Sequence, residues 1–167
     1  MEILDEYRDF MSQVDGLLAE NTIDKNELKQ CDTVAYETSS NERYEVVKAA
    51  LVRSATLLSE RDTNGRLVSI LKMDPPLETG DWQTPYVELL QPKPTRENID
   101  GIDCVFFVTK QPVRKFYEQH AGTDFEPKGL ANEHHPYIEL KGATIAIKFH
   151  GMDFGAVVEL ERTLNGR

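Results

Sequence analysis

The seven residues DTVAYET at positions 32–38 decide the fold, because a segment of the same kind returns as DCVFFVT at positions 103–109. Both segments fit the pattern D-x-V-x-x-x-T, and they start 71 residues apart. Each is rich in β-branched and aromatic residues, which is typical of a strand. In both halves of the chain the segment is followed by helical spacing and then by further strand patterns. The sequence therefore predicts two copies of one βαβββ module.

The helices are predicted from capping residues and from apolar spacing. Capping boxes start a short helix at Asp24 and a longer one at Ser39, while Thr109 and Asp153 are expected to cap the helices that follow them. An additional helix precedes the first module. Its apolar residues recur every three to four positions and form one stripe: Ile3, Tyr7, Phe10, Val14 and Leu18.

The strands complete the two modules. Asn64-Gly65 suits a type I′ turn and predicts a hairpin between strands at 56–61 and 67–73. The remaining strands are expected at 86–90, 124–127, 137–140 and 143–150. We expect one compact α+β domain with a cup-shaped mixed sheet. It divides into a helical extension (1–30), a first module (31–90), a proline-containing linker (91–102), a second module (103–150) and a terminal helix (151–167).

Composition excludes several classes of partner. With 19 Lys and Arg against 29 Asp and Glu, the 167-residue chain carries a net charge of −10, which repels nucleic acid and anionic membranes. Two cysteines are too few for a disulfide framework. The N-terminal residues are acidic and lack the apolar run of a signal peptide, so we expect a cytoplasmic protein.

Short motifs across most of the chain resemble the YecM-like family. They are LSE at 58–60 leading to NGR at 64–66, DWQ at 81–83 followed by VEL at 87–89, and TIAIKFH at 144–150. This family is similar to the vicinal oxygen chelate proteins, which include glyoxalases, extradiol dioxygenases and bleomycin-resistance proteins. The resemblance implies that the two half-sheets enclose a cup, in which many members bind a divalent metal.

The resemblance also implies which positions would face such a metal. They are the first and last strands of each module, at Thr33, Glu88, Cys104 and Lys148. Members of this branch resemble one another in having histidine at the ranks of Thr33 and Cys104, and both histidines are missing here. One carboxylate, one thiol, one hydroxyl and a cation are a poor ligand set for a divalent ion. We therefore expect no tightly held metal or other cofactor; if a metal is bound, Glu88 and His150 are the residues to test.

Strand alternation supplies the candidate catalytic residues. It places Tyr86 and Glu88 on one face of their strand, and Lys148 and His150 on one face of theirs. If the modules pair as in the family, Glu88 and Lys148 meet in the cavity. They are then either a general base beside an anion-holding ammonium or a structural ion pair.

The other candidates for ligand binding are Thr33, Tyr86, Trp82, Cys104 and His150. Trp82 either walls the cavity or closes the core. Cys104 is either a small buried hydrophobe or a nucleophile, and a nucleophile would need His150 nearby. The adjacent pair His134-His135 is expected on the surface rather than at a metal, because neighbours on an extended segment point in opposite directions.

Three functions fit these features. The first is binding of a small anionic or carbonyl-bearing molecule in the cup, without a tight metal. The second is a metal-dependent isomerase, lyase or oxygenase of the same superfamily. The third is a non-catalytic module whose terminal helices bind a partner protein. Phosphate loops, GxSxG, HExxH and CxxC are absent from the sequence, which removes the usual basis for nucleotide or cofactor chemistry.

Overall fold

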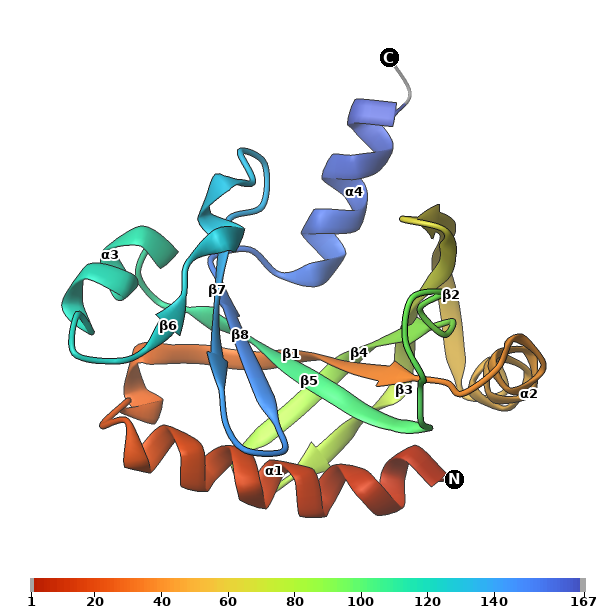
Figure 1. The fold of residues 1–167 in the computed structure, drawn as a ribbon, viewed down its shortest axis with the longest axis horizontal. Helices are drawn as coiled ribbons and strands as arrows, with labels where there is room; N and C mark the ends of the chain where they lie inside the picture. Colours follow the sequence, from red (N-terminus) through yellow and green to blue (C-terminus); the bar gives the residue numbers. More distant parts are fainter. Residues whose placement is uncertain (1, 166–167) are drawn as a thin grey trace.

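The computed structural model describes residues 2–165 and has one mixed eight-stranded sheet with the order β2-β3-β4-β1-β5-β8-β7-β6 (Figure 1). The first half contains α1 (Glu2–Glu20), the 3₁₀ turn η1 (Lys25–Glu27), β1 (Leu28–Glu37), α2 (Asn41–Leu51), β2 (Ala55–Thr63), β3 (Arg66–Thr79) and β4 (Trp82–Leu90). The second half contains β5 (Gly101–Thr109), α3 (Val113–Gln119), β6 (Phe125–Glu126), the 3₁₀ turn η2 (Lys128–Ala131), β7 (Tyr137–Lys141), β8 (Ala146–His150) and α4 (Phe154–Asn165).

The predicted α+β fold with two βαβββ modules is confirmed. In each module the first and last strands are parallel neighbours, β1 with β4 and β5 with β8. The modules join where β1 and β5 pair antiparallel at the centre of the sheet. Ala35 lies opposite Glu88, and Phe106, 71 positions after Ala35, lies opposite Lys148. Glu88 and Lys148 therefore occupy equivalent positions in the two modules.

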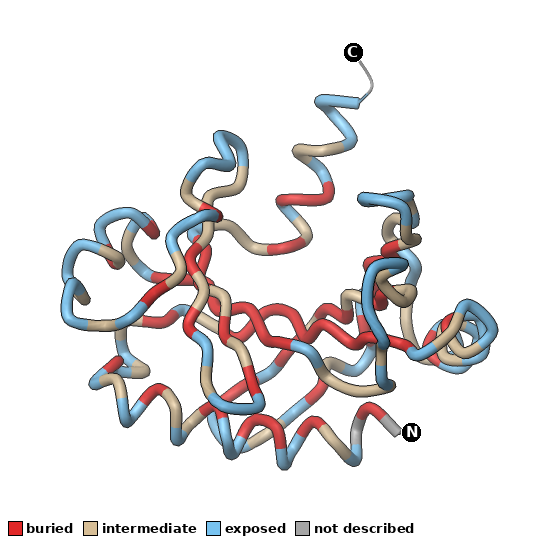
Figure 2. Tube along the Cα trace, in the orientation of Figure 1, coloured by how far each residue is buried: buried red, intermediate tan, exposed pale blue. Residues whose placement is uncertain are grey.

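The terminal helices lie on opposite faces of the sheet (Figure 1). The apolar stripe of α1 is buried and forms the main core with the sheet, and its members are Ile3, Tyr7, Phe10, Met11, Val14 and Leu18. A second apolar cluster occupies the other face, where Phe154 and Val158 of α4 pack near Tyr86 and Phe106. Buried residues are concentrated in the central strands between these helices (Figure 2).

Most predictions made from local sequence signals were correct, but two of the predicted helix caps were wrong. The turn between β2 and β3 has positive φ at Asn64 (55°) and Gly65 (82°), as a type I′ turn requires. Asp153 accepts hydrogen bonds from the first turn of α4. Ser40, one residue after the predicted Ser39, caps α2 through the amide of Arg43. Thr109 does not cap α3, because its hydroxyl donates to carbonyl groups at Gln111 and His150.

Within residues 2–165, no helix combines the length and the apolar character that crossing a membrane requires.

Candidate functional site

A cavity of about 620 Å³ lies on the face of the sheet that α4 covers. Both modules line it, together with α4 and the loop before β7. Seven charged side chains face it: Arg61, Arg66, Lys93 and Lys148 against Glu88, Asp103 and Glu161. The cavity thus has more cations than anions, although the chain as a whole has a net charge of −10.

Lys148 enters the cavity from β8. Its ammonium nitrogen lies 5.0 Å from the ring centre of Phe106 and 5.5 Å from that of Tyr137, distances suited to cation–π attraction. Among the described residues the ammonium has neither a hydrogen bond nor an ion pair. Burial opposes its charge, but nearby acidic groups, Glu88 and Glu139 among them, raise its pKa above the usual lysine value. Lys148 is therefore a charged hydrogen-bond donor whose N–H groups have no acceptor among the described residues.

Glu88 faces the same cavity from β4, as the strand alternation predicts. Its carboxylate is half-buried and makes no hydrogen bond among the described residues. Burial raises its pKa, while the positive charges of Lys148 and Arg66 act in the opposite direction. The predicted direct contact between Glu88 and Lys148 is wrong. Their charged groups form no ion pair, since the ammonium lies over the two aromatic rings instead.

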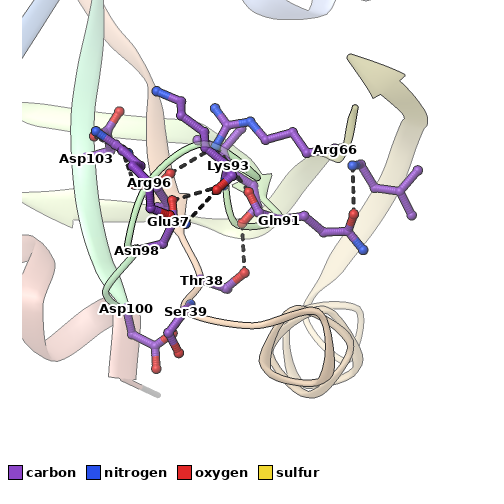
Figure 3. A network of polar contacts seen from close by, with 12 residues as sticks. Glu37, Thr38, Ser39, Arg66, Gln91, Lys93, Arg96, Asn98, Asp100 and Asp103 are labelled. Carbon is purple, nitrogen blue, oxygen red and sulfur yellow. Dashed lines mark hydrogen bonds and ion pairs between the residues drawn. The ribbon is translucent and has the colours of Figure 1, made fainter. Parts of the chain in front are cut away.

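The lining arginines are already paired. Glu37, at the end of β1, forms ion pairs with Arg66 at 3.0 Å and with Arg96 at 2.5 Å (Figure 3). Arg61 pairs with Glu161 of α4. Within the part of the chain that the structure describes, only Lys148 and Lys93 line the cavity as cations without an ion pair. Of these two, Lys148 is the one held in place by aromatic rings.

A row of three buried or half-buried groups reaches the cavity beside Lys148. Nε2 of His150 lies 3.0 Å from Oδ1 of Asp32, and Nδ1 of His150 lies 2.6 Å from Nε2 of His135. Asp32 and His150 are fully buried, whereas His135 lines the cavity. The other oxygen of Asp32 accepts the amide N–H of Phe154 at 2.8 Å.

Asp32 was missed by the sequence reasoning because of a β-bulge. Cys31 pairs with Phe107 and Thr33 with Phe106, so β1 has one extra residue, Asp32, at this point. A bulge interrupts the alternation of faces. Asp32 therefore lies on the cavity side of the sheet next to Thr33, where strict alternation would have placed it with the core under α1.

The prediction of two surface histidines at 134 and 135 is half wrong. His134 is exposed. His135 is turned inward, against His150 and within 6.1 Å of the Phe154 ring. Asn132 holds this loop, because its side-chain oxygen accepts the amides of both histidines at 3.1 and 3.0 Å. The only sequence signal for this arrangement is the extended backbone that Pro136 imposes on the residue before it.

Several predicted ligand-binding residues lie beneath the cavity rather than in its lining. Thr33 is fully buried, and its hydroxyl has no partner among the described residues. Cys104 is also fully buried, and burial raises the pKa of its thiol to about 12, so it is neutral and unreactive at pH 7. Tyr86 is buried with its hydroxyl 3.3 Å from Asp153. His150 reaches the cavity only through His135.

Trp82 does not line this cavity and closes the core instead. Its ring meets Phe107 edge-on, with the ring centres 5.0 Å apart, in the cluster under α1. Thr84 also faces α1, where it bonds to Tyr7, whereas Tyr86 faces α4. The alternation along β4 therefore fails between residues 84 and 86, opposite an irregularity in the pairing with β3. That failure removes Trp82 from the face that carries Glu88.

The sequence matches the model of the YecM protein family over residues 1–161. The chain belongs to the YecM family. Among curated proteins, no sequence is a match for this YecM chain. The structural genomics protein EC4020 is similar to it over 96% of this chain and 91% of its own, with a TM-score of 0.81 at 21% identity.

A methylmalonyl-CoA epimerase, a vicinal oxygen chelate protein, is a more distant structural neighbour of the YecM chain. The match has a TM-score of 0.53 at 12% identity, and it covers 76% of this chain and 97% of the epimerase. At this identity the likeness shows the fold alone. The YecM chain therefore has the vicinal oxygen chelate fold, as the motifs predicted.

The divalent metal that this fold often carries does not fit the residues of the YecM chain. At the four expected positions, Thr33 and Cys104 are buried and uncharged, and Lys148 is a cation. His150 cannot join Glu88 as a ligand, because both of its ring nitrogens are engaged, with Asp32 and His135. Over residues 2–165, no three His, Cys, Asp or Glu side chains are grouped so as to hold a metal ion.

Proposed function

We propose that the cavity binds a small anionic or carbonyl-bearing molecule through Lys148, without a tightly held metal. The observation that carries the proposal is the ammonium of Lys148, which has no ion pair within residues 2–165 and lies over the rings of Phe106 and Tyr137 inside the cavity. A desolvated ammonium that lacks a counter-ion is strongly stabilised when an anion arrives.

Glu88 adds a hydrogen-bond acceptor to the cavity, in addition to the donor Lys148. It is the equivalent of Lys148 in the other module, it also has no hydrogen-bond partner among the residues that the structure describes, and burial raises its pKa. Such a carboxylate accepts a hydrogen bond from a hydroxyl or amide of the ligand, or takes a proton from it. The ligand that fits is therefore anionic or carbonyl-bearing at one end and a hydrogen-bond donor at the other.

The test is a titration with simple anions, monitored by backbone amide chemical shifts in NMR. Acetate, inorganic phosphate and sulfate are the probes. We expect shifts around Lys148, Phe106 and Tyr137, and we expect Lys148→Met to abolish them. Lys141→Met is the matched control, because it removes the same charge from an exposed side chain on the neighbouring strand β7. Equal weakening by both variants, or shifts spread over the surface, would contradict the proposal.

The metal-free part of the proposal has its own measurement. Protein purified without chelator is expected to contain far less than one equivalent of any divalent metal by elemental analysis. One bound equivalent that resists dialysis would favour the metal-dependent alternative. Binding of a partner protein through the apolar stripe of α1 has little support, because that stripe is buried against the sheet.

A further inference from the structure

We propose that His135, His150 and Asp32 form a proton relay, which accepts a proton from a molecule in the cavity and passes it to the buried carboxylate of Asp32. The relay deepens the proposed function and rests on it, because the cavity must admit a ligand for the relay to act. It adds a requirement to that ligand: besides an anionic or carbonyl group for Lys148, it must bring an ionisable proton to His135.

The hydrogen-bond partners determine the direction of the relay. Asp32 accepts the amide of Phe154 on Oδ2, so its Oδ1 faces Nε2 of His150. With Asp32 ionised, His150 must donate through Nε2–H, which leaves its Nδ1 as an acceptor. Nε2 of His135 must then donate to that nitrogen. A bare lone pair therefore remains on Nδ1 of His135, at the cavity end of the row.

The transfer balances with one proton and no oxidant or reductant. The bond between the ligand and its proton breaks, and Nδ1 of His135 gains an N–H. The Nε2 proton of His135 moves to Nδ1 of His150, and the Nε2 proton of His150 moves to Oδ1 of Asp32. Both imidazoles end neutral with their tautomers reversed, Asp32 ends neutral, and the ligand gains one negative charge. The Lys148 ammonium, which lines the same cavity, is placed to offset that charge.

Two features distinguish this row from a purely structural network. First, it is open at one end, because Nδ1 of His135 has no hydrogen-bond partner among residues 2–165 although the ring lines the cavity. Second, the pKa shifts agree with delivery of the proton to Asp32. Burial, with His150 and Lys148, lowers the pKa of His135 to about 4, so a positive charge on this ring is disfavoured. Burial also raises the pKa of Asp32.

The first experiment reads the tautomers directly, with no ligand present. In wild-type protein labelled with ¹⁵N at pH 7.5, we expect His135 and His150 both to carry their proton on Nε2, with a coupling across the N–H···N bond between them. A proton on Nδ1 of His135 would overturn the proposal. This measurement needs no variant, so the proposal remains falsifiable if a substitution prevents folding.

The second experiment reverses the direction of the hydrogen bonds between Asp32, His150 and His135. In Asp32→Asn the side-chain oxygen must accept the Phe154 amide, so the NH₂ group faces Nε2 of His150 and forces it to become an acceptor. We expect both His135 and His150 to switch to the Nδ1–H form. His120, which bonds to Glu27, and exposed His134 are internal controls and should not change. Unchanged tautomers in a folded Asp32→Asn protein would overturn the proposal.

The third experiment tests whether the lone pair is accessible from the cavity. Diethyl pyrocarbonate acylates an imidazole nitrogen that has a free lone pair, and mass spectrometry locates the product. We expect modification of His135 in the wild type and its loss in Asp32→Asn, with His134 modified in both. An unmodified His135 in the wild type would overturn the relay. Since no anion is present, this failure is distinct from a failure of anion binding at Lys148.

Discussion

Replacing Asp32 by alanine tests how strongly the buried carboxylate ties α4 to β1 and β8. The side chain is fully buried and accepts two hydrogen bonds. One comes from the amide of Phe154 at 2.8 Å and the other from Nε2 of His150 at 3.0 Å. Its removal leaves two buried donors unpaired, at about 1–3 kcal/mol each, or roughly 2–6 kcal/mol in total. Burial of the carboxylate itself is unfavourable, as its raised pKa indicates, and alanine relieves that cost. We therefore expect a net loss of about 2–4 kcal/mol.

Urea unfolding followed by circular dichroism measures this loss as a lower midpoint at an unchanged slope. Asp153→Ala is the control, because Asp153 caps the same helix through amides in its first turn. Loss of such a cap costs typically about 1 kcal/mol. If Asp32→Ala destabilises the protein no more than Asp153→Ala does, Asp32 is not the anchor that the geometry indicates.

Three further changes have defined outcomes. Gly129→Ala would place its Cβ 2.4 Å from the carbonyl oxygen of Tyr137 and 2.6 Å from its ring, so we expect a loss of about 1–3 kcal/mol and weaker acetate binding in the NMR titration. In a double-mutant cycle of Glu88→Gln and Lys148→Met, the coupling should stay below about 1 kcal/mol, because the two groups form no ion pair; about 3 kcal/mol would indicate a buried contact. The lowered pKa of His135 means that the folded state binds fewer protons than the unfolded state between pH 6.5 and about 4. Stability should therefore decrease as the pH is lowered through this window, by at most about 1.4 kcal/mol per unit. The decrease should be steeper than in His135→Gln, which lacks the imidazole but keeps the buried carboxylates and their opposite contribution.

The repeated module was predictable because its signals are local. Alternation and β-branched content mark the strands, and Asn64-Gly65 encodes a turn whose positive φ values few other pairs tolerate. The error at Ser39 is of the same local kind, since two adjacent serines can both act as a cap and only the path of the chain selects Ser40. The equivalence of Glu88 and Lys148 was also predictable, because the two modules share one strand order.

The relay was not predictable, because each of its members depends on a departure from a regular pattern. Asp32 lies in a bulge, and the alternation that correctly placed Glu88 and Lys148 gives the wrong face for it. His135 lies in a loop whose path is set by hydrogen bonds to Asn132. The sequence left Trp82 either at the cavity or in the core, and it lies in the core because the alternation along β4 fails between residues 84 and 86.

The equivalent positions in the two modules have become chemically opposite, and this determines what the cavity can hold. Lys148 lies across from Phe106, whose ring stabilises its charge, whereas Glu88 lies across from Ala35, which offers its carboxylate no partner. A ligand with a negative charge at both ends would meet Lys148 at one end and be repelled by Glu88 at the other. A monoanion with a hydrogen-bond donor at its far end satisfies both residues in a single orientation. In that orientation the anionic end lies at Lys148, which lines the cavity together with His135. We therefore expect acetate to bind this cavity better than sulfate. The opposite order would show that the other cations lining the cavity, rather than Glu88 and Lys148, select the ligand.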